Sequence, residues 1–174
     1  MDLRIAGTVN DSITDGSGIR FVIFFQGCLH HCPGCQNPQT QSLTGGFVVS
    51  HETILEKIRQ NPILDGITLS GGEPMLQAKG AALLAHEAHQ MGLRVNTYTG
   101  YLWEDLIRSG NQDWLNLLKE TDYLIDGPYL KAQRNLNLLF RGSENQRIID
   151  VPQSLKAKTP ILYFPEHRLM KRSA

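Results

Sequence analysis

Apolar and polar positions along the chain follow two periods. Short runs rich in β-branched and aromatic residues indicate strands, and apolar residues spaced three or four apart indicate helices. Helical spacing follows Ser50, a good N-cap, and recurs over about residues 75–91, 102–109 and 112–120. Strands are expected at residues 20–26, 66–70, 93–99, 122–126, 146–151 and 160–164. Strands and helices therefore alternate.

This alternation predicts βαβ units and a mainly parallel sheet. A closed eight-fold barrel typically takes about 250 residues, and this chain has 174. We therefore expect an α/β fold, an open partial (β/α) barrel of about five to six units with one side of its interior uncovered. Residues 1–174 are expected to form one domain with a basic tail that frays from about residue 167.

Composition narrows the range of partners. Seventeen basic residues balance seventeen acidic ones, so the chain has no net field to attract nucleic acid or an anionic membrane. The longest apolar runs, residues 21–25 and 81–85, are too short to span a bilayer. Asp2 stands where a signal peptide would be basic and then apolar. We expect a cytoplasmic protein with no nucleic-acid or membrane partner.

All three cysteines of the chain, Cys28, Cys32 and Cys35, lie in the segment GCLHHCPGCQN. Disulfides between residues this close would constrain almost no chain, and the number of cysteines is odd. Metal binding is therefore the better interpretation of these thiols.

Two metal groups remain open for three thiols. A structural zinc would need a fourth ligand, which His30 or His31 could offer. Zinc sites usually draw their ligands from two separated pairs, however, and this segment ties distant parts of the chain together poorly. The alternative is a [4Fe-4S] cluster, which is normally held by four thiolates. Three thiolates leave one iron open to bind a small molecule.

Four unusual segments each follow an expected strand. The cysteine segment follows the first strand, and GGEP, TYTG and DGPY follow the next three. Ligands and catalytic groups of such sheets lie at the carboxyl ends of the strands. We expect the four segments to meet at one edge of the sheet.

Several motifs resemble those of a known family. The CxxxCxxC spacing together with GGEP resembles the radical S-adenosylmethionine superfamily. DGSGIR and FFQGC resemble its glycyl-radical-enzyme activases, with Ser17 where proline is usual. The CPGC sequence, with Gly34, and the segments VNTYTGYLWEDL, YLIDGPYL and LLFRGSENQRIIDV are similar to the activating proteins of anaerobic (class III) ribonucleoside-triphosphate reductases. The resemblance covers about residues 3–151.

The resemblance implies an enzyme, an activase that uses a [4Fe-4S] cluster and S-adenosyl-L-methionine. It would generate a glycyl radical on the reductase by abstracting a hydrogen atom, and an open barrel wall would admit a loop of that partner. A flavodoxin-like donor would supply the electron. The alternatives are an activase of another glycyl radical enzyme, of the pyruvate formate-lyase type, or another radical S-adenosylmethionine enzyme. A non-enzymatic zinc module gives no reason for GGEP or DGSGIR.

The resemblance also implies roles for individual residues, with no catalytic residue beyond the cluster and the cosubstrate. Cys28, Cys32 and Cys35 would hold the cluster, and His30 and His31 would be ordinary loop residues. The backbone at Gly34, Cys35 and Gln36 would contact the adenine, and Gly71, Gly72 and Glu73 would hold the methionine end. Glycines suit that place because the backbone must come close to the ligand.

The remaining candidates rest on weaker grounds. Thr97 and Asp126 are chosen as cosubstrate contacts because they lie at strand ends on the same edge. Asn145, Gln146 and Arg147 lie in the most distinctive segment, and the sequence gives no physical account of their role. Trp103 and Trp114 are expected in the core.

Overall fold

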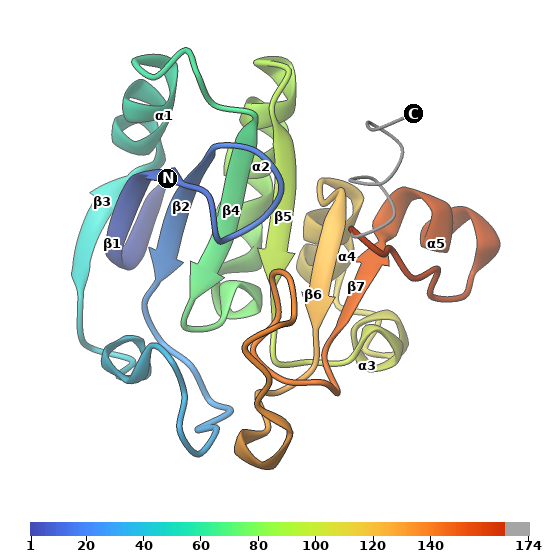
Figure 1. The fold of residues 1–174 in the computed structure, drawn as a ribbon. Helices are drawn as coiled ribbons and strands as arrows, with labels where there is room; N and C mark the ends of the chain where they lie inside the picture. The colour runs from blue at the N-terminus through green and yellow to red at the C-terminus, as the bar shows by residue number, and fades with distance from the viewer. Residues whose placement is uncertain (166–174) are drawn as a thin grey trace.

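Seven strands form a single open sheet in the computed structural model, which describes residues 1–165 (Figure 1). The expected frayed tail from residue 167 lies outside the described residues. The strands, in chain order, are β1 (Asp2–Ser12), β2 (Arg20–Phe25), β3 (Phe47–Ser50), β4 (Gly66–Gly71), β5 (Arg94–Tyr98), β6 (Tyr123–Asp126) and β7 (Arg147–Asp150). The α-helices are α1 (His51–Arg59), α2 (Ala78–Gln90), α3 (Trp103–Arg108), α4 (Gln112–Lys119) and α5 (Val151–Ala157), and the 3-10 helices are η1 (Pro38–Thr40), η2 (Pro74–Gln77) and η3 (Lys131–Gln133).

The strand order is β3-β1-β2-β4-β5-β6-β7. The central strands β2, β4, β5 and β6 are parallel, and helices cross between them. The α/β class and the open sheet are therefore confirmed. The parallel part has four strands because antiparallel strands complete the sheet at both edges, β1 and β3 at one and β7 at the other.

The expected strand at residues 160–164 is wrong. Only Leu162 forms a bridge, to Ile149, and two backbone hydrogen bonds attach this segment to β7. The strands β1 and β3 were not expected. Elsewhere the boundaries agree closely, and the Ser50 side chain caps α1 by accepting a hydrogen bond from the Thr53 amide.

The two faces of the sheet differ in chemistry. Residues at alternate positions of the parallel strands, such as Ile23, Leu69 and Val95, pack against the helices in the main hydrophobic core. Figure 1 shows these helices on one side of the sheet and long loops crossing the other. The loop-covered face carries more polar groups: beside the apolar Val22, its buried side chains in β2, β4 and β5 include Arg20, Thr68, Ser70 and Asn96.

Polar side chains of this face attach the loops that cover it. The Thr68 hydroxyl donates to the carbonyl of Asp15, at 2.8 Å, in the loop of residues 13–19. The Tyr98 hydroxyl donates to the carbonyl of Phe140, also at 2.8 Å, in the segment of residues 134–146. Each bond gives a backbone carbonyl of a loop a hydrogen-bond donor on a sheet strand, so each loop is attached to the sheet at that point.

The buried side chain of Arg20 connects the start of β2 to the neighbouring strands. Its guanidinium donates to the Thr68 hydroxyl and to the backbone carbonyls of Ile67 and Arg94. Burial lowers the pKa of Arg20 to about 10, so the side chain remains a cation at neutral pH. The arginine of DGSGIR thus links three neighbouring strands at the end opposite the cysteines.

No helix among residues 1–165 is both long enough and apolar enough to cross a membrane.

A histidine at the end of α2 joins this helix to the segment between α4 and β6. His89 places Nδ1 3.1 Å from Glu120 Oε2 and Nε2 3.1 Å from Asp122 Oδ2. The bond to Asp122 raises the pKa of His89. Burial alone would raise the pKa of Asp122, but hydrogen bonds from His89 and the Val95 amide hold it below its usual value.

We predict that His89→Gln destabilises the protein most in mildly acidic solution. The contribution of His89 is complete below its unfolded-state pKa of about 6.5 and disappears as pH rises through its higher folded-state pKa. The contribution of Asp122 is complete above about 3.9 and disappears as pH falls through its lower folded-state pKa. Because both groups are about one third exposed, the loss at pH ~5.5 should be about 0.5–1 kcal/mol.

Urea unfolding of both proteins at pH ~5.5 and pH ~8.5 measures this difference. The control is His86→Gln, because His86 pairs with Glu120 from an about half exposed position. An equal loss at both pH values would contradict the prediction.

Candidate functional site

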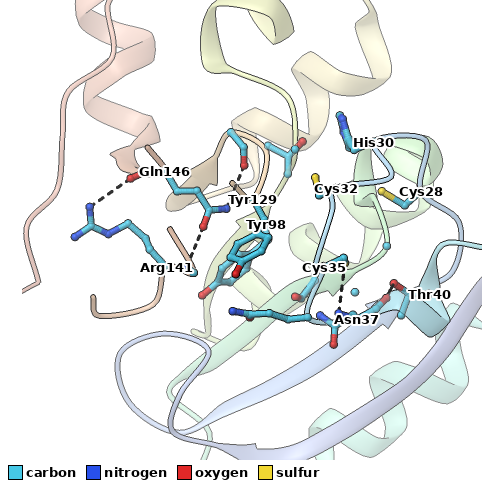
Figure 2. Close-up of a pocket in the computed structure, with 18 of the residues that line it drawn as sticks. Cys28, His30, Cys32, Cys35, Asn37, Thr40, Tyr98, Tyr129, Arg141 and Gln146 are labelled. Atoms are coloured by element: carbon cyan, nitrogen blue, oxygen red, sulfur yellow. Dashed lines mark hydrogen bonds between the residues drawn. The ribbon is translucent and has the colours of Figure 1, made fainter. Parts of the chain in front are cut away.

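The three cysteines line one cavity of about 330 Å³ at the carboxyl ends of the parallel strands. Their loop leaves β2 at Gly27 and is closed at its base by two backbone hydrogen bonds, from Gly27 to Thr40 and from Cys28 to Gln41. Figure 2 shows this loop on one side of the cavity and Tyr98, Tyr129, Arg141 and Gln146 on the other. We call this space the cysteine cavity.

The structure brings the four expected segments together. Besides the cysteine loop, the cavity is lined by the ends of β4, β5 and β6 with their following turns, and by the segment of residues 138–146. The residues from these parts are Ser70, Gly71, Gly72, Tyr98, Thr99, Gly100, Gly127, Tyr129, Leu138, Phe140, Arg141, Gly142 and Gln146, and the loop of residues 13–19 adds Thr14 and Asp15. Parallel pairing explains the convergence, since all four strands end at one edge.

Gly71 and Gly72 line the cavity, and the structure gives a further reason for glycine at both positions. A Cβ at Gly71 would lie 2.6 Å from Phe24 Cα, and one at Gly72 would lie 2.3 Å from the Gly27 carbonyl oxygen. The space is thus occupied by the chain's own backbone. The Gly72 amide donates to Phe25 O at 2.8 Å, which fixes the end of β4 against the start of the cysteine loop.

Glu73 does not line the cavity but organises its walls. The carboxylate is 1 % exposed. It accepts hydrogen bonds from the amides of Met75 and Gly100, at 3.0 and 2.9 Å, and from the Thr99 hydroxyl. Its Oε2 also lies 2.8 Å from His30 Nε2. One side chain therefore ties the cysteine loop and the TYTG turn to the start of η2.

His30 lines the cavity and is also part of this network. Its ring packs edge-on against Tyr101, with centroids 4.5 Å apart. A Cβ at Gly100 would lie 2.4 Å from the His30 ring, so the glycine makes room for the imidazole. His31, exposed and at a φ of 47°, lies on the outside of the loop. Both histidines are loop residues in this arrangement.

The donor set fits a [4Fe-4S] cluster. Three thiols surround one cavity, and the Asn37 amide donates to Cys35 Sγ at 3.4 Å, the kind of hydrogen bond that tunes cluster potentials. No three His, Cys, Asp or Glu side chains among residues 1–165 converge as ligands of a single metal ion. A cluster does not need such convergence because each thiolate binds a different iron. Burial raises the pKa of Cys28, so bound metal must displace its proton.

Two predicted contact residues lie away from the cavity. Thr97 is fully buried, and its hydroxyl lies 2.9 Å from that of Thr121 on the helix side of the sheet. Strict alternation along β5 puts its neighbour Tyr98 on the cavity side instead. Asp126 is also fully buried, and it accepts hydrogen bonds from the Trp103 amide and from Arg147. It is therefore a structural carboxylate that starts α3.

Gly34 also falls outside the residues that line the cavity, whereas Gln36 lines it. A Cβ at Gly34 would lie 3.2 Å from Lys131 Cδ and 3.6 Å from the Tyr129 ring. With a φ of 75°, Gly34 turns the loop where it packs against the segment after β6.

Asn145, Gln146 and Arg147 now have a physical role, which the sequence did not suggest. Asn145 donates to the Pro128 carbonyl at 2.7 Å, and Gln146 donates to the Gly127 carbonyl at 3.1 Å. Arg147 pairs with Asp126 and Glu104, and its hydrogen bonds to these two carboxylates raise the pKa of the guanidinium. Three consecutive side chains therefore hold the DGPY turn, one residue each, as a wall of the cavity.

Comparison with known proteins identifies similar sequences. A family model described as a 4Fe-4S single cluster domain matches residues 14–149. The "anaerobic ribonucleoside-triphosphate reductase-activating protein" of Vibrio cholerae is 34% identical over 149 residues, which cover 78% of this chain and 90% of that protein. The protein of the same name from Enterobacteria phage T4 is 33% identical over 77% of this chain and 85% of its own length. The "pyruvate formate-lyase-activating enzyme" of Clostridium pasteurianum is 34% identical over 70% of this chain but 50% of its own length.

We predict that Glu73→Gln lowers the free energy of unfolding by about 3 kcal/mol, because the amide turns a donor toward groups that are themselves donors and leaves them buried and unsatisfied. Thermal unfolding of the metal-free proteins should show a midpoint lower by roughly 6–12 °C. The control is Glu56→Gln, since Glu56 is exposed on α1. A midpoint within about 2 °C of the unsubstituted protein would mean that Glu73 does not organise the site.

Proposed function

This chain belongs to the family of anaerobic ribonucleoside-triphosphate reductase-activating proteins, iron–sulfur activating enzymes of the radical S-adenosylmethionine type, and we propose that its protein substrate is the anaerobic ribonucleoside-triphosphate reductase. The observation that carries the proposal is the cysteine cavity, with three thiols facing the ends of β4, β5 and β6. The length match supports this partner, because the reductase-activating relatives are covered over 85–90% of their length and the pyruvate formate-lyase-activating enzyme over 50%.

In this proposal Cys28, Cys32 and Cys35 hold a [4Fe-4S] cluster whose fourth iron is free to bind S-adenosylmethionine. When bound, the two groups would supply one electron and a hydrogen-atom acceptor: the sulfonium carbon–sulfur bond would break, methionine and 5′-deoxyadenosine would be released, and a glycine α-carbon of the reductase would keep the radical. The base of the cysteine loop is fixed against the end of β4 by two backbone hydrogen bonds, from the Gly72 amide to Phe25 O and from the Glu73 amide to Gly27 O.

The walls of the cavity supply contacts for the cosubstrate. We assign the backbone at Cys35 and Gln36 to the adenine side and Gly71 and Gly72 to the methionine side, because these residues line the cavity from two different segments, the cysteine loop and the end of β4. Glu73 acts by holding the backbone of both walls in place. Tyr98 replaces Thr97 as the contact from β5.

The electron must come from outside the chain in this scheme. All three cysteines are used by one cluster, and the sequence contains no more. A flavodoxin-like protein in the cytoplasm is the proposed donor.

A second candidate is activation of another glycyl radical enzyme. The identity to the Clostridium pasteurianum enzyme, 34%, is as high as that to the Vibrio cholerae protein. Exchanging the protein substrate separates these two functions.

We predict that anaerobically reconstituted protein holds about four irons per chain, the content of one [4Fe-4S] cluster. Each of Cys28→Ala, Cys32→Ala and Cys35→Ala should lose most of this iron, because three thiolates are the whole protein ligand set. The matched control is His31→Asn, which changes an exposed residue of the same loop and tolerates its positive φ. Chemical iron analysis checks the expectation, and one tightly held zinc per chain in place of iron would contradict it.

The protein substrate is tested with reduced protein, S-adenosylmethionine and the reductase. Paramagnetic resonance should detect a carbon-centred radical doublet on the reductase, and none with the Cys32→Ala variant. A doublet with pyruvate formate-lyase and none with the reductase would favour the second candidate. No doublet with either substrate, from protein with an intact cluster, would contradict activation of both.

A further inference from the structure

A second cavity, of about 1090 Å³, lies on the same polar face of the sheet as the cysteine cavity. Its walls include Arg20, Asn96 and Tyr123, which come from the amino-terminal halves of β2, β5 and β6. Among the described residues Phe140 alone lines both cavities. The loop of residues 13–19 also borders both, with Thr14 and Asp15 on the cysteine cavity and Ile13 and Gly16 on the second one. Phe140 therefore stands, beside that loop, at the boundary between the place where the cluster is expected and the larger second cavity.

Phe140 is held in an uncommon conformation. Its φ is 60°, in the left-handed region that a bulky non-glycine residue rarely adopts. Such strained positions persist only when the surroundings determine them, and they cluster at functional sites. Two hydrogen bonds bracket it: one from Tyr98 Oη to the Phe140 carbonyl at 2.8 Å, and one from the Gly142 amide to Gln146 Oε1 at 2.9 Å.

The hydrogen bond from Tyr98 joins the end of β5 to the segment of residues 134–146. Tyr98 is the last residue of β5, a rigid central strand, and its phenol lines the cysteine cavity (Figure 2). Burial raises the pKa of Tyr98 well above its usual value, so the hydroxyl remains a donor over the working pH range. A central strand thus sets the position of Phe140 through one side chain.

We propose that Tyr98 is a positioning residue that holds Phe140 as a partition between the two cavities, and that this partition keeps water and small solutes of the second cavity away from the reacting centre. The inference rests on the proposed function. A group that removes hydrogen atoms reacts with any donor that reaches it, so exclusion of other donors is part of the catalytic task. The chain supplies that exclusion with Phe140 and fixes it with Tyr98.

The partition has a chemical consequence when the partner is absent. One electron from an external reductant then breaks the sulfonium carbon–sulfur bond, methionine leaves, and the hydrogen atom that completes 5′-deoxyadenosine comes from a small solute such as a buffer or glycerol molecule. This abortive reaction is slower when Phe140 blocks the route from the second cavity. It becomes faster when the partition opens.

The test compares Tyr98→Phe and Phe140→Gly with the unsubstituted protein, each with its cluster reconstituted. Tyr98→Phe removes the one hydroxyl that holds the Phe140 carbonyl, and Phe140→Gly removes the ring while suiting the positive φ. The matched control is Tyr163→Phe, because Tyr163 packs against Tyr123 at the β7 edge and lines neither cavity. Iron content and the thermal midpoint show whether each variant is folded and loaded.

The first readout does not depend on activity. Hydrogen exchange of the amides in residues 138–142 should become about fivefold faster in Tyr98→Phe, the change in population that loss of one hydrogen bond gives. Exchange elsewhere should be unchanged. Exchange of this segment at the unsubstituted rate would overturn the assignment of Tyr98.

The second readout is the abortive formation of 5′-deoxyadenosine by reduced protein without a partner. We expect an increase of about fivefold in Tyr98→Phe and at least as much in Phe140→Gly, with no change in Tyr163→Phe. If Tyr98 and Phe140 only stabilised the fold, their substitution would lower the rate of 5′-deoxyadenosine formation or leave it unchanged. A lowered or unchanged rate in both variants would contradict the proposal that Phe140 is a partition. Absence of a glycyl radical on the reductase would contradict the proposed protein substrate. Hydrogen exchange and 5′-deoxyadenosine formation do not need that substrate, so they test the role of Phe140 independently.

Discussion

The buried carboxylate of Glu73 is the interaction on which the arrangement of the site depends. It gathers donors from three segments that are distant in sequence: His30 in the cysteine loop, Met75 at the start of η2, and Thr99 with Gly100 after β5. A buried carboxylate without partners would be costly, so each segment must stay in place to satisfy it. The thiols consequently face the ends of the neighbouring strands in a fixed geometry.

On the loop-covered face of the sheet, too, buried polar side chains hold segments that are distant in sequence. Most α/β sheets cover both faces with helices, whereas here one face is covered by loops that hydrogen-bond to Thr68 and Tyr98. This arrangement leaves two cavities over the strands instead of a second hydrophobic core. A cofactor site and an approach for a large partner can both be built on such a face, because loops can be spaced apart where packed helices cannot.

Much of this architecture could be predicted from the sequence, because it depends on local patterns. The parallel strands follow from their apolar runs, and the cysteine, GGEP, TYTG and DGPY segments meet because parallel strands end at one edge. Alternation along β5 could also have selected Tyr98 over Thr97, since Val95 is a core residue and Tyr98 lies on the opposite face. Thr97 was chosen as a residue at a strand end, without regard to the face of the sheet on which it lies.

Other features depend on contacts between distant segments, which no local pattern reveals. The clamp of Asn145, Gln146 and Arg147 on the DGPY turn requires β7 to lie antiparallel to β6. The close approach of Gly72 to the Gly27 carbonyl likewise depends on how β2 and β4 end side by side. The clamp and the close approach each explain residues of a sequence motif by contacts with the protein's own backbone.

The central claim is that three thiols hold a cluster with one open iron in the cysteine cavity. Paramagnetic resonance of the anaerobically reduced protein, recorded before and after addition of S-adenosylmethionine, tests it most directly. The account predicts a reduced-cluster signal that shifts when the cosubstrate binds, since a ligand then occupies the open iron. An unchanged signal from a fully loaded cluster would contradict the account, because the cosubstrate would then have no place on the metal.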